Sequence, residues 1–345
     1  MTTQRFICLV SFLFATALLL AGCSTKPANT FDPRSGVVSK DFQVDIGALI
    51  PDTIRQDSKY DNYYTCDHIV FLGQHDSLRY VLSVTFGRAL ADNRFKRAER
   101  DFTGFLYDGR AWIPLPYTRM KHDSMRVDIN YPYVFGGLNW TQPHTDGEVS
   151  YDRHDLKFDL KFSELAPVQS LRIGVVDRRC HAIGNGTLLL PNDTITGTAY
   201  YELVQIEGNN PFVHITNGLI YTNYDWLALT STSGRRLLCS SDSTTANDRI
   251  KKNFLSLESS GSLRYADGSD HVRVISEDLV GDLKTNDLLA SKKNISVPDL
   301  GIEVKMTLTD ERIFNTNGNS LSLVAGTLTI DGKLEDVWGV IEHRR

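Results

Sequence analysis

The sequence has little cysteine, no excess of positive charge and no long segment with convincing helical spacing. It contains 5 cysteines in 345 residues, and their spacings match no zinc-binding or CxxC pattern. Lysine and arginine number 37 against 42 aspartates and glutamates, so the net charge is −5 and no basic excess points to nucleic acid. These absences argue against a structural zinc site, a nucleic-acid-binding surface and a helical fold. We therefore expect no metal and no cofactor.

The N-terminus has the three parts of an export signal. A single cation, Arg5, precedes a largely apolar stretch over Phe6–Leu20, and small residues follow it. This stretch is shorter than the roughly 20 residues that a membrane-spanning helix needs, which argues against an uncleaved anchor. The tetrad Leu20-Ala21-Gly22-Cys23 resembles the lipobox of bacterial lipoproteins. That resemblance implies a signal peptide over residues 1–22 and lipid attachment, including an acyl chain such as palmitate, at Cys23.

The residues after Cys23 predict a tether and a location. Residues 23–40 are rich in Ser, Thr, Pro, Asn and Gly and have no periodicity, which is typical of a flexible linker. Ser24 after the lipidated position resembles cargo that is sorted to the outer membrane. We expect a lipid-anchored protein of the bacterial cell envelope, on the periplasmic face of the outer membrane. Its predicted partners are the membrane, through lipidated Cys23, and a hydrophobic small molecule. Protein partners cannot be named from the sequence.

The mature length exceeds what one hydrophobic core usually organises, so two domains are expected. Cys66, Cys180 and Cys239 remain beyond the predicted lipidation site, in a compartment where disulfides form. Two arrangements of these three cysteines are open: one disulfide with a free thiol, or three buried thiols.

Alternation with a period of two dominates the body of the chain. Leu156–Phe162 and Gly301–Leu308 each place apolar residues on one face and charged or polar residues on the other, as strands with one dry side do. Pairs of the Asp-Gly type at Asp108-Gly109, Asp267-Gly268 and Asp331-Gly332 predict hairpin turns between such runs. Many short antiparallel strands favour an all-β fold of barrels or sandwiches.

A series of short motifs runs in order through most of the mature chain. It comprises Tyr63-Tyr64-Thr65, Ser83-Val84-Thr85-Phe86, Phe158–Phe162 ahead of Pro167-Val168, Gly197–Glu202, Asp225–Leu229 and Gly234-Arg235. The series resembles the double-lipocalin (AttH-like) proteins, which include carotenoid 1,2-hydratase. This resemblance implies two tandem lipocalin-like (calycin) antiparallel β-barrels, which we place at residues 41–178 and 179–345. Barrels of about eight strands are wide enough to hold one small ligand.

The same resemblance points to a candidate site. Hydratase-like members of the family read approximately Gly-x-Ala-Trp-Met-Asp-His where this chain has Tyr200, Glu202 and Leu203 in place of the Trp, Asp and His. A carboxyl group remains at Glu202, but its neighbouring histidine is missing. We therefore expect Tyr64, Tyr200, Glu202 and Trp226 to line a ligand pocket, with Glu202 as the catalytic acid only if the chain is an enzyme. The plain alternative is that these residues are core aromatics and a polar residue at a barrel rim.

Two other polar stretches offer weaker candidates. Asp67-His68 with His75 would place polar groups near one hairpin, and Arg178–His181 combines a thiol with cations that lower thiol pKa values. Nothing in their spacing makes them converge, as metal ligands must.

Three functions remain open from the sequence. The favoured one is a membrane-anchored envelope lipoprotein that binds a hydrophobic or amphipathic small molecule, such as a lipid or an isoprenoid. The second is a hydratase, isomerase or cyclase that uses Glu202 as acid on an isoprenoid-like substrate. The third is a structural or partner-binding lipoprotein with filled barrels. The missing histidine favours binding over catalysis, and a cavity of ligand size would separate the first two functions from the third.

Overall fold

The fold is built almost entirely from antiparallel strands. The structure, a computed structural model, describes residues 38–39, 63–89, 97–123, 133–141, 145–153, 155–173, 177–207, 223–243, 251–282, 287–314 and 320–344. Within these ranges the elements are strands β1 to β20 and one 3-10 turn, η2, at Pro298–Leu300. No helix of the described ranges is long and apolar enough to cross a membrane. The predicted signal peptide and Cys23 lie outside the described residues.

The strands form two ten-stranded sheets. The first sheet has the order β5-β4-β3-β2-β11-β10-β9-β8-β7-β6. Its strands are β2 (Tyr63–His75), β3 (Leu78–Ala89), β4 (Arg97–Tyr107), β5 (Trp112–Asp123), β6 (Tyr133–Phe135), β7 (Leu138–Trp140), β8 (Gly147–Arg153), β9 (Leu156–Ile173), β10 (Asp177–Leu189) and β11 (Thr194–Glu207).

The second sheet has the order β1-β15-β14-β13-β12-β20-β19-β18-β17-β16. Its strands are β1 (Val38–Ser39), β12 (Asn223–Ser231), β13 (Arg236–Ser243), β14 (Lys251–Ser259), β15 (Ser262–Asp267), β16 (Arg273–Asp282), β17 (Asp287–Val297), β18 (Ile302–Phe314), β19 (Ser320–Ile330) and β20 (Lys333–Arg344).

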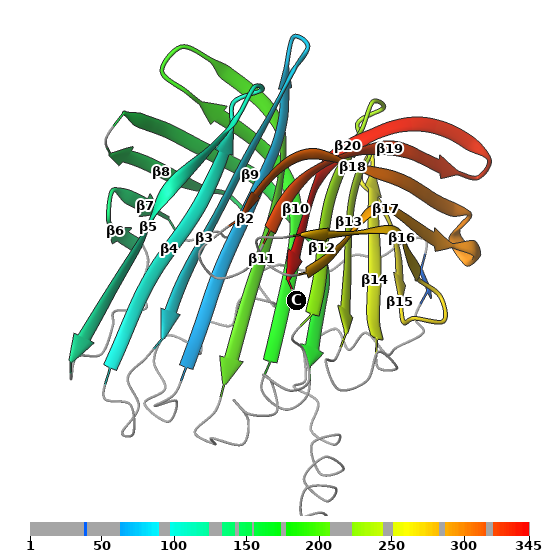
Figure 1. Cartoon of the computed structure of the whole chain (residues 1–345), viewed down its shortest axis with the longest axis horizontal. Coiled ribbons are helices and arrows are strands. Elements are labelled where there is room, and N and C mark those ends of the chain that lie inside the picture. Colours follow the sequence, from blue (N-terminus) through cyan, green and yellow to red (C-terminus); the bar gives the residue numbers. More distant parts are fainter. Residues whose placement is uncertain are drawn as a thin grey trace, which may run out of the picture.

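The two sheets repeat one connectivity. In each, the last strand returns to pair with an early strand, β11 with β2 and β20 with β12. Figure 1 shows both sheets strongly curled and lying beside each other, with β11 and β10 of the first next to β12 and β13 of the second. We call the curled sheets the first and second barrel. The expected all-β fold of two tandem lipocalin-like barrels is confirmed.

The period-two alternation is confirmed where it is clearest. In β9, Phe158, Leu160 and Phe162 are buried, whereas Lys157, just before them, and Lys161, between the last two, are exposed. Buried and exposed residues alternate in the same way along β18 from Ile302 to Thr307. One face of each strand therefore packs inside its barrel and the other meets solvent.

Three apolar clusters organise the core. The first interior cluster fills the first barrel and includes Phe71, Phe102, Trp140, Tyr151 and Phe158. The second interior cluster fills the second barrel and is mostly aliphatic, with Leu, Ile, Val and Met side chains. The interface cluster joins the barrels and consists of Val70, Leu72, Val81, Phe105, Tyr107, Val168, Ile183, Tyr200, Trp226, Ala228, Leu238, Phe254, Leu263, Tyr265, Leu321, Leu323, Trp338 and Val340.

Strands at the centre of the molecule are buried on both faces. In β2, Ile69 and Phe71 point into the first barrel, while Val70 and Leu72 point to the interface cluster. These four residues form a continuous apolar run, as strands covered on both sides do. Each such fully buried side chain stabilises the fold by about 1.5–3 kcal/mol, so burial of these residues helps to hold the two barrels together.

The predicted boundary between residues 178 and 179 is wrong. It cuts β10, which pairs along its length with β9 and β11 in the first sheet. The chain passes to the second sheet only between Glu207 and Asn223. The reason is that β11 closes the first sheet by pairing with β2, a long-range contact that local patterns do not reveal.

Two smaller expectations also change. The end of the predicted tether forms β1, in which Val38 and Ser39 pair with β15, because the outer edge of β15 offers unpaired backbone groups. Asp267-Gly268 is not a hairpin: it leads from β15 to β16, which lie at opposite ends of the strand order of the curled sheet. The hairpin at Asp331-Gly332 is confirmed, with Ile330 paired to Lys333 and both turn residues at positive φ.

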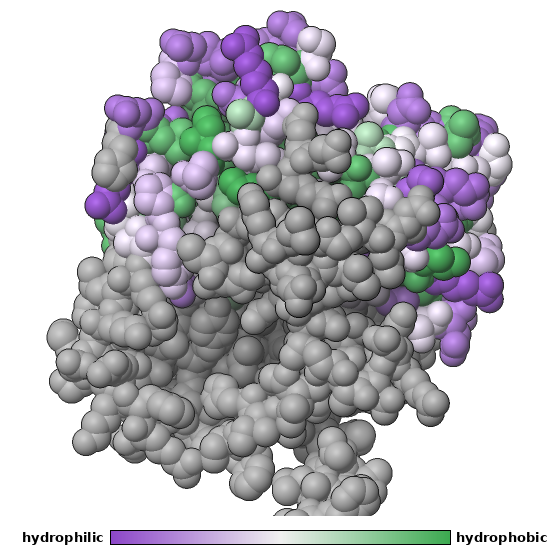
Figure 2. All heavy atoms as spheres, viewed as in Figure 1, coloured by the Kyte–Doolittle hydropathy of each residue, from purple (hydrophilic) through white to green (hydrophobic). Residues whose placement is uncertain are grey.

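On the face shown in Figure 2, hydrophilic side chains cover most of the described surface, with small hydrophobic patches between them. Among the residues whose burial the structure describes, the exposed large apolar ones are Val134, Ile275 and Leu334. They come from β6, β16 and β20, and single exposed apolar residues of this kind are common on protein surfaces.

Candidate functional site

A row of polar side chains crosses the first barrel where it faces the second. The strand register aligns Thr85 of β3, His68 of β2, Glu202 of β11 and His181 of β10 side by side. Residues directly opposite each other in neighbouring strands point to the same face of a sheet. Val70 lies two residues after His68 in β2, and Tyr200 lies two residues before Glu202 in β11, so each shares a face with its neighbour in the row. Because Val70 and Tyr200 belong to the interface cluster, the row faces the second barrel.

The second barrel presents a corresponding row. There the register aligns Ser240 of β13, Trp226 of β12, Glu342 of β20 and Leu321 of β19. The paired strands β12 and β20 have the same place in their sheet as β2 and β11 in theirs. Glu342 thus corresponds to Glu202, and Trp226 takes the place of His68.

The Glu202 carboxylate has a histidine at each of its oxygens. Its Oε1 atom makes a hydrogen bond of 3.1 Å with Nε2 of His181, and its Oε2 atom lies 3.7 Å from Nδ1 of His68. The side chains are 12% exposed for Glu202, 5% for His68 and 1% for His181. A carboxyl group and two imidazoles in a dry setting form an acid–base group, since little water screens their interactions.

His68 links the carboxylates of the two barrels. Its Nδ1 atom is also 3.7 Å from Oε2 of Glu342, and its Nε2 atom makes a hydrogen bond of 3.1 Å with Oγ of Ser83. The hydroxyl of Tyr224 donates to Oε1 of Glu342 at 2.8 Å. Burial alone lowers the pKa of His68, but the contact with Glu202 and the charges of Glu342 and Glu202 outweigh it, so this pKa lies above its usual value of 6.5.

Aromatic rings enclose the histidines. The Trp226 ring lies 5.1 Å from that of His68, and the Phe254 ring lies 4.9 Å from that of His181. Within the described residues, Nδ1 of His181 and Nε1 of Trp226 are buried and have no hydrogen-bond partner. Buried polar atoms of this kind are rare and call for an explanation, such as a role in proton transfer or a bound molecule.

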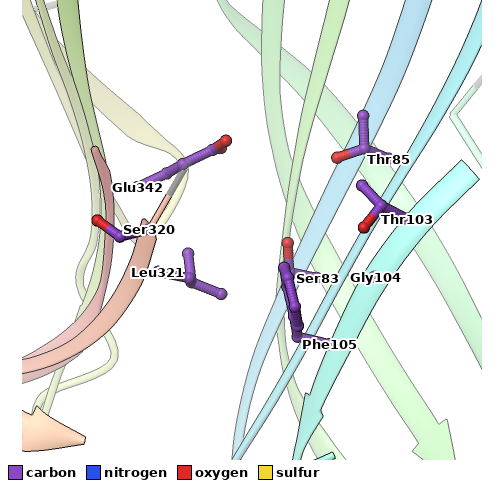
Figure 3. Close-up of a pocket in the computed structure, with 8 residues that line it drawn as sticks. All are labelled: Ser83, Thr85, Thr103, Gly104, Phe105, Ser320, Leu321 and Glu342. Carbon is purple, nitrogen blue, oxygen red and sulfur yellow. The ribbon is translucent and has the colours of Figure 1, made fainter. Parts of the chain in front are cut away.

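A small pocket opens beside this group. Its lining consists of Ser83, Thr85, Thr103, Gly104 and Phe105 from the first barrel and Ser320, Leu321 and Glu342 from the second. Figure 3 shows Glu342 and Leu321 of the second barrel pointing toward Ser83, Thr85 and Thr103 of the first, whereas the Ser320 hydroxyl is turned away. The pocket volume of about 10 Å³ is room for roughly one water molecule. It is far smaller than a ligand pocket, which measures roughly 300–1,000 Å³.

The structure brings together some of the predicted site residues. Glu202 and Trp226 both contact His68 across the interface. Tyr200 is fully buried in the interface cluster, where its hydroxyl donates to the carbonyl oxygen of Leu229 and burial raises its pKa. Tyr200 therefore joins the barrels. Tyr64 lies in β2, opposite Ile206 of β11, and its side chain is outside the described part of the chain.

Sequence reasoning missed three members of the group. In the sequence, His68 and His181 stand out only within the two weaker candidate stretches, and no motif marks Glu342. Both histidines immediately precede apolar residues that are buried in the structure, Ile69 and Ala182. The apolar run that follows His68 in β2 is typical of a strand covered on both faces. This run was the one local signal that could have placed His68 at an interface.

Further buried polar groups lie inside the barrels. In the second barrel, Asp225 contacts Lys293 through one oxygen and His343 through the other; we call these three residues the Asp225 group. In the first barrel, the hydroxyl of Tyr201 donates to Oδ1 of Asp67 at 2.6 Å. In the part of the chain that the structure describes, no group of three or more His, Cys, Asp or Glu residues is arranged to hold a metal ion.

Comparisons with known proteins bear on the fold. No protein-family model matches the sequence, and no curated protein is significantly similar to it. An AttH-type protein from Nitrosomonas europaea has a similar structure, with a TM-score of 0.55 and 14% identity over 86% of this chain and 96% of that one. Kievitone hydratase from Nectria haematococca is similar too, with a TM-score of 0.54 and 9% identity over 91% of this chain and 98% of that one. The chain thus has the fold of AttH-like proteins, two tandem lipocalin-like barrels.

Proposed function

We propose that the chain is an acid–base catalyst of the hydratase type, a lyase that adds water to a double bond of a hydrophobic, isoprenoid-like substrate or removes it. The observation that carries this proposal is the position of Glu202, buried at the interface with His181 at 3.1 Å and His68 at 3.7 Å. Hydration of an alkene needs a proton donor in a dry site. A buried carboxyl group held between two imidazoles meets that need.

The chemistry follows from these groups. Glu202 gives its proton to one carbon of the double bond, and a water oxygen bonds to the other carbon. His181 holds the Glu202 carboxyl in place, and protonated His68 stands beside it as a source for the next proton. General acid catalysis of this kind contributes typically 10²- to 10⁴-fold in rate.

The histidines change the balance between binding and catalysis. At the sequence level, Leu203 in place of a histidine left Glu202 without a partner. In the fold, the neighbouring strands β2 and β10 each place a histidine beside Glu202, His68 on one side and His181 on the other. Apolar side chains pack inside each described barrel, whereas the buried acid–base group lies between the barrels, which favours a site at the interface over one inside a barrel. The structural similarity to kievitone hydratase shows only the fold, so the proposed activity rests on the side chains of the interface.

A substrate reaches Glu202 only if the interface opens. The described pocket holds about one water, so aromatic side chains such as Trp226 have to move when a larger molecule enters. Motions of lids and domains gate many enzymes in this way.

The test measures uptake of water oxygen. The purified chain is incubated in heavy-oxygen water with isoprenoid alkenes, geraniol and lycopene, and products are identified by mass spectrometry. We expect a labelled alcohol from the wild type and a loss of about 10²-fold or more in rate for Glu202→Gln. The matched control, Glu303→Gln, changes an exposed carboxylate of β18 and should leave the rate unchanged. No label in the wild-type product, or equal rates for wild type and Glu202→Gln, would contradict the proposal.

We also propose that this chemistry takes place at a membrane surface. The lipobox-like tetrad supports lipidation at Cys23, which would hold the barrels on the periplasmic face of the bacterial outer membrane, near apolar substrates. In a bacterium fed a clickable palmitate analogue, the wild type should become labelled and Cys23→Ala should not. Cys66→Ala is the control and should keep the label. Label on Cys23→Ala would refute lipidation at this residue.

A further inference from the structure

The pocket beside Glu342 has the lining of a water site. Oxygen-bearing side chains reach it from both barrels: Ser83, Thr85 and Thr103 on one side, and Glu342 on the other. Its volume of about 10 Å³ suits a single water, and an ordered water usually needs two to four polar partners. A hydroxyl both donates and accepts, and a carboxylate accepts several hydrogen bonds, so this lining can satisfy one water completely.

The two carboxylates differ in their relation to the pocket. Glu342 lines it, whereas Glu202 does not. Each carboxylate has one oxygen 3.7 Å from the same nitrogen, Nδ1 of His68. Tyr224 holds the other oxygen of Glu342 with a hydrogen bond of 2.8 Å. The geometry therefore separates a carboxylate that lines the pocket from one that does not, with a histidine between them.

We propose, resting on the proposed function, that this pocket holds the water that is added and that Glu342 is the general base that activates it. The water oxygen bonds to the carbon that develops positive charge, and one water proton passes to Glu342. The other carbon receives its proton from Glu202. One C–O bond and one C–H bond form, the π bond breaks, and the alcohol keeps the second water proton.

His68 returns the system to its starting state. After one turnover Glu202 has lost a proton and Glu342 has gained one. Protonated His68 gives its Nδ1 proton to Glu202 and takes the proton of Glu342 at the same atom, which the two distances of 3.7 Å allow after a small movement. No oxidant, reductant or metal takes part, since every proton is accounted for by these groups and one water.

The first experiment uses the hydration assay with geraniol and lycopene. We expect Glu342→Gln to lower kcat about 10²- to 10⁴-fold with little change in KM. Thr85→Val and Thr103→Val, which remove single hydroxyls from the pocket, should each lower kcat by about tenfold or more. Thr187→Val, in β10 and outside the pocket lining, is the matched control and should keep the wild-type rate. Thermal unfolding of each variant checks that the fold is retained.

The pH profile separates a base from a structural residue. The groups that face Glu342 include His68 of β2 and Tyr224 of β12, with Glu202 of β11 beyond His68. With Glu342 as base, a fall in wild-type kcat at low pH depends on the Glu342 carboxylate. In Glu342→Gln, the remaining kcat should not decrease in this way at low pH. A low-pH limb that persists unchanged in Glu342→Gln would overturn the role.

A crystal structure supplies a readout without activity. We expect an ordered water within hydrogen-bond distance of the Glu342 carboxylate and of a threonine hydroxyl, and its loss in Thr103→Val. An empty pocket in the wild type would overturn the assignment. If the wild type hydrates the probes while Glu342→Gln keeps full activity, this inference fails and the proposed function stands. If the wild type hydrates neither probe, the proposed function fails, and this inference fails with it.

Discussion

Nδ1 of His68 lies 3.7 Å from Oε2 of Glu342, and this ion pair joins β2 of the first barrel to β20 of the second. The same nitrogen is as close to Glu202 of its own barrel. A single buried imidazole thus lies between two carboxyl groups, one from each barrel. The stability of the inter-barrel contact depends on its protonation.

His68→Gln should therefore destabilise the protein in a pH-dependent way. Because folding raises the pKa of His68 above 6.5, its contribution to stability is fully present below that pH and is lost as pH rises through the folded-state value. Urea unfolding at a series of pH values should give the largest difference between wild type and variant just below pH 6.5. The control, His75→Gln, changes a histidine that is 49% exposed and should give a small difference throughout. A His68→Gln difference that grows with rising pH would refute the assignment.

Asp225→Asn should show the opposite dependence. Burial alone raises the pKa of Asp225, but the charge of Lys293 and the hydrogen bond and charge of His343 outweigh it and hold this pKa far below its usual 3.8. The contribution of Asp225 is therefore present above pH 3.8 and is lost as pH falls through the lower folded-state value. Near neutral pH the variant leaves Lys293 buried without its carboxylate, a loss of about 3–5 kcal/mol.

The measurement for Asp225 is denaturant unfolding from neutral pH to below pH 3.8, where the difference from wild type should shrink. Asp331→Asn is the control, because Asp331 pairs with Arg264 at the surface and is 57% exposed. Such a pair contributes about 1 kcal/mol or less. Equal losses for the two variants near neutral pH would show that the Asp225 group is not a buried network.

Gly339→Ala should disrupt the pairing of β20 with β12. A Cβ at Gly339 would overlap the carbonyl oxygen of Ala228, which is backbone and cannot turn aside. Relief requires β12 to shift, so we expect a loss of about 3 kcal/mol. Gly234→Ala is the control: it has open space around it and a φ of +82°, so its cost is only the backbone strain of about 1–2 kcal/mol. A smaller loss for Gly339→Ala than for Gly234→Ala in thermal unfolding would contradict this reading.

Local patterns predicted the elements of the fold well where one face of a strand is wet. The alternation in β9 and β18 and the turn at Asp331-Gly332 depend on neighbours in sequence, and the structure has all three. The same reasoning misplaced the barrel boundary and the connection at Asp267-Gly268. Both errors concern which distant strands pair, a matter of sheet closure that nearby residues do not specify.

Some residues of the candidate site could be predicted from the sequence, and others could not. Glu202 and Trp226 were found because each lies in a short motif that resembles a known family. His68, His181 and Glu342 come from three other strands, and their convergence depends on the register of β2, β10 and β20 and on the packing of two barrels.

By itself, the sequence determined the all-β class, the tandem arrangement and the acidic residue at position 202, because alternation and motif order are local properties of the chain. Only the tertiary structure decided where the first barrel ends and which groups surround Glu202. The physical reason is that strand closure and barrel packing place side chains from distant segments within a few ångströms of each other. A lone carboxyl group in the sequence becomes, at the interface, one member of a buried acid–base group.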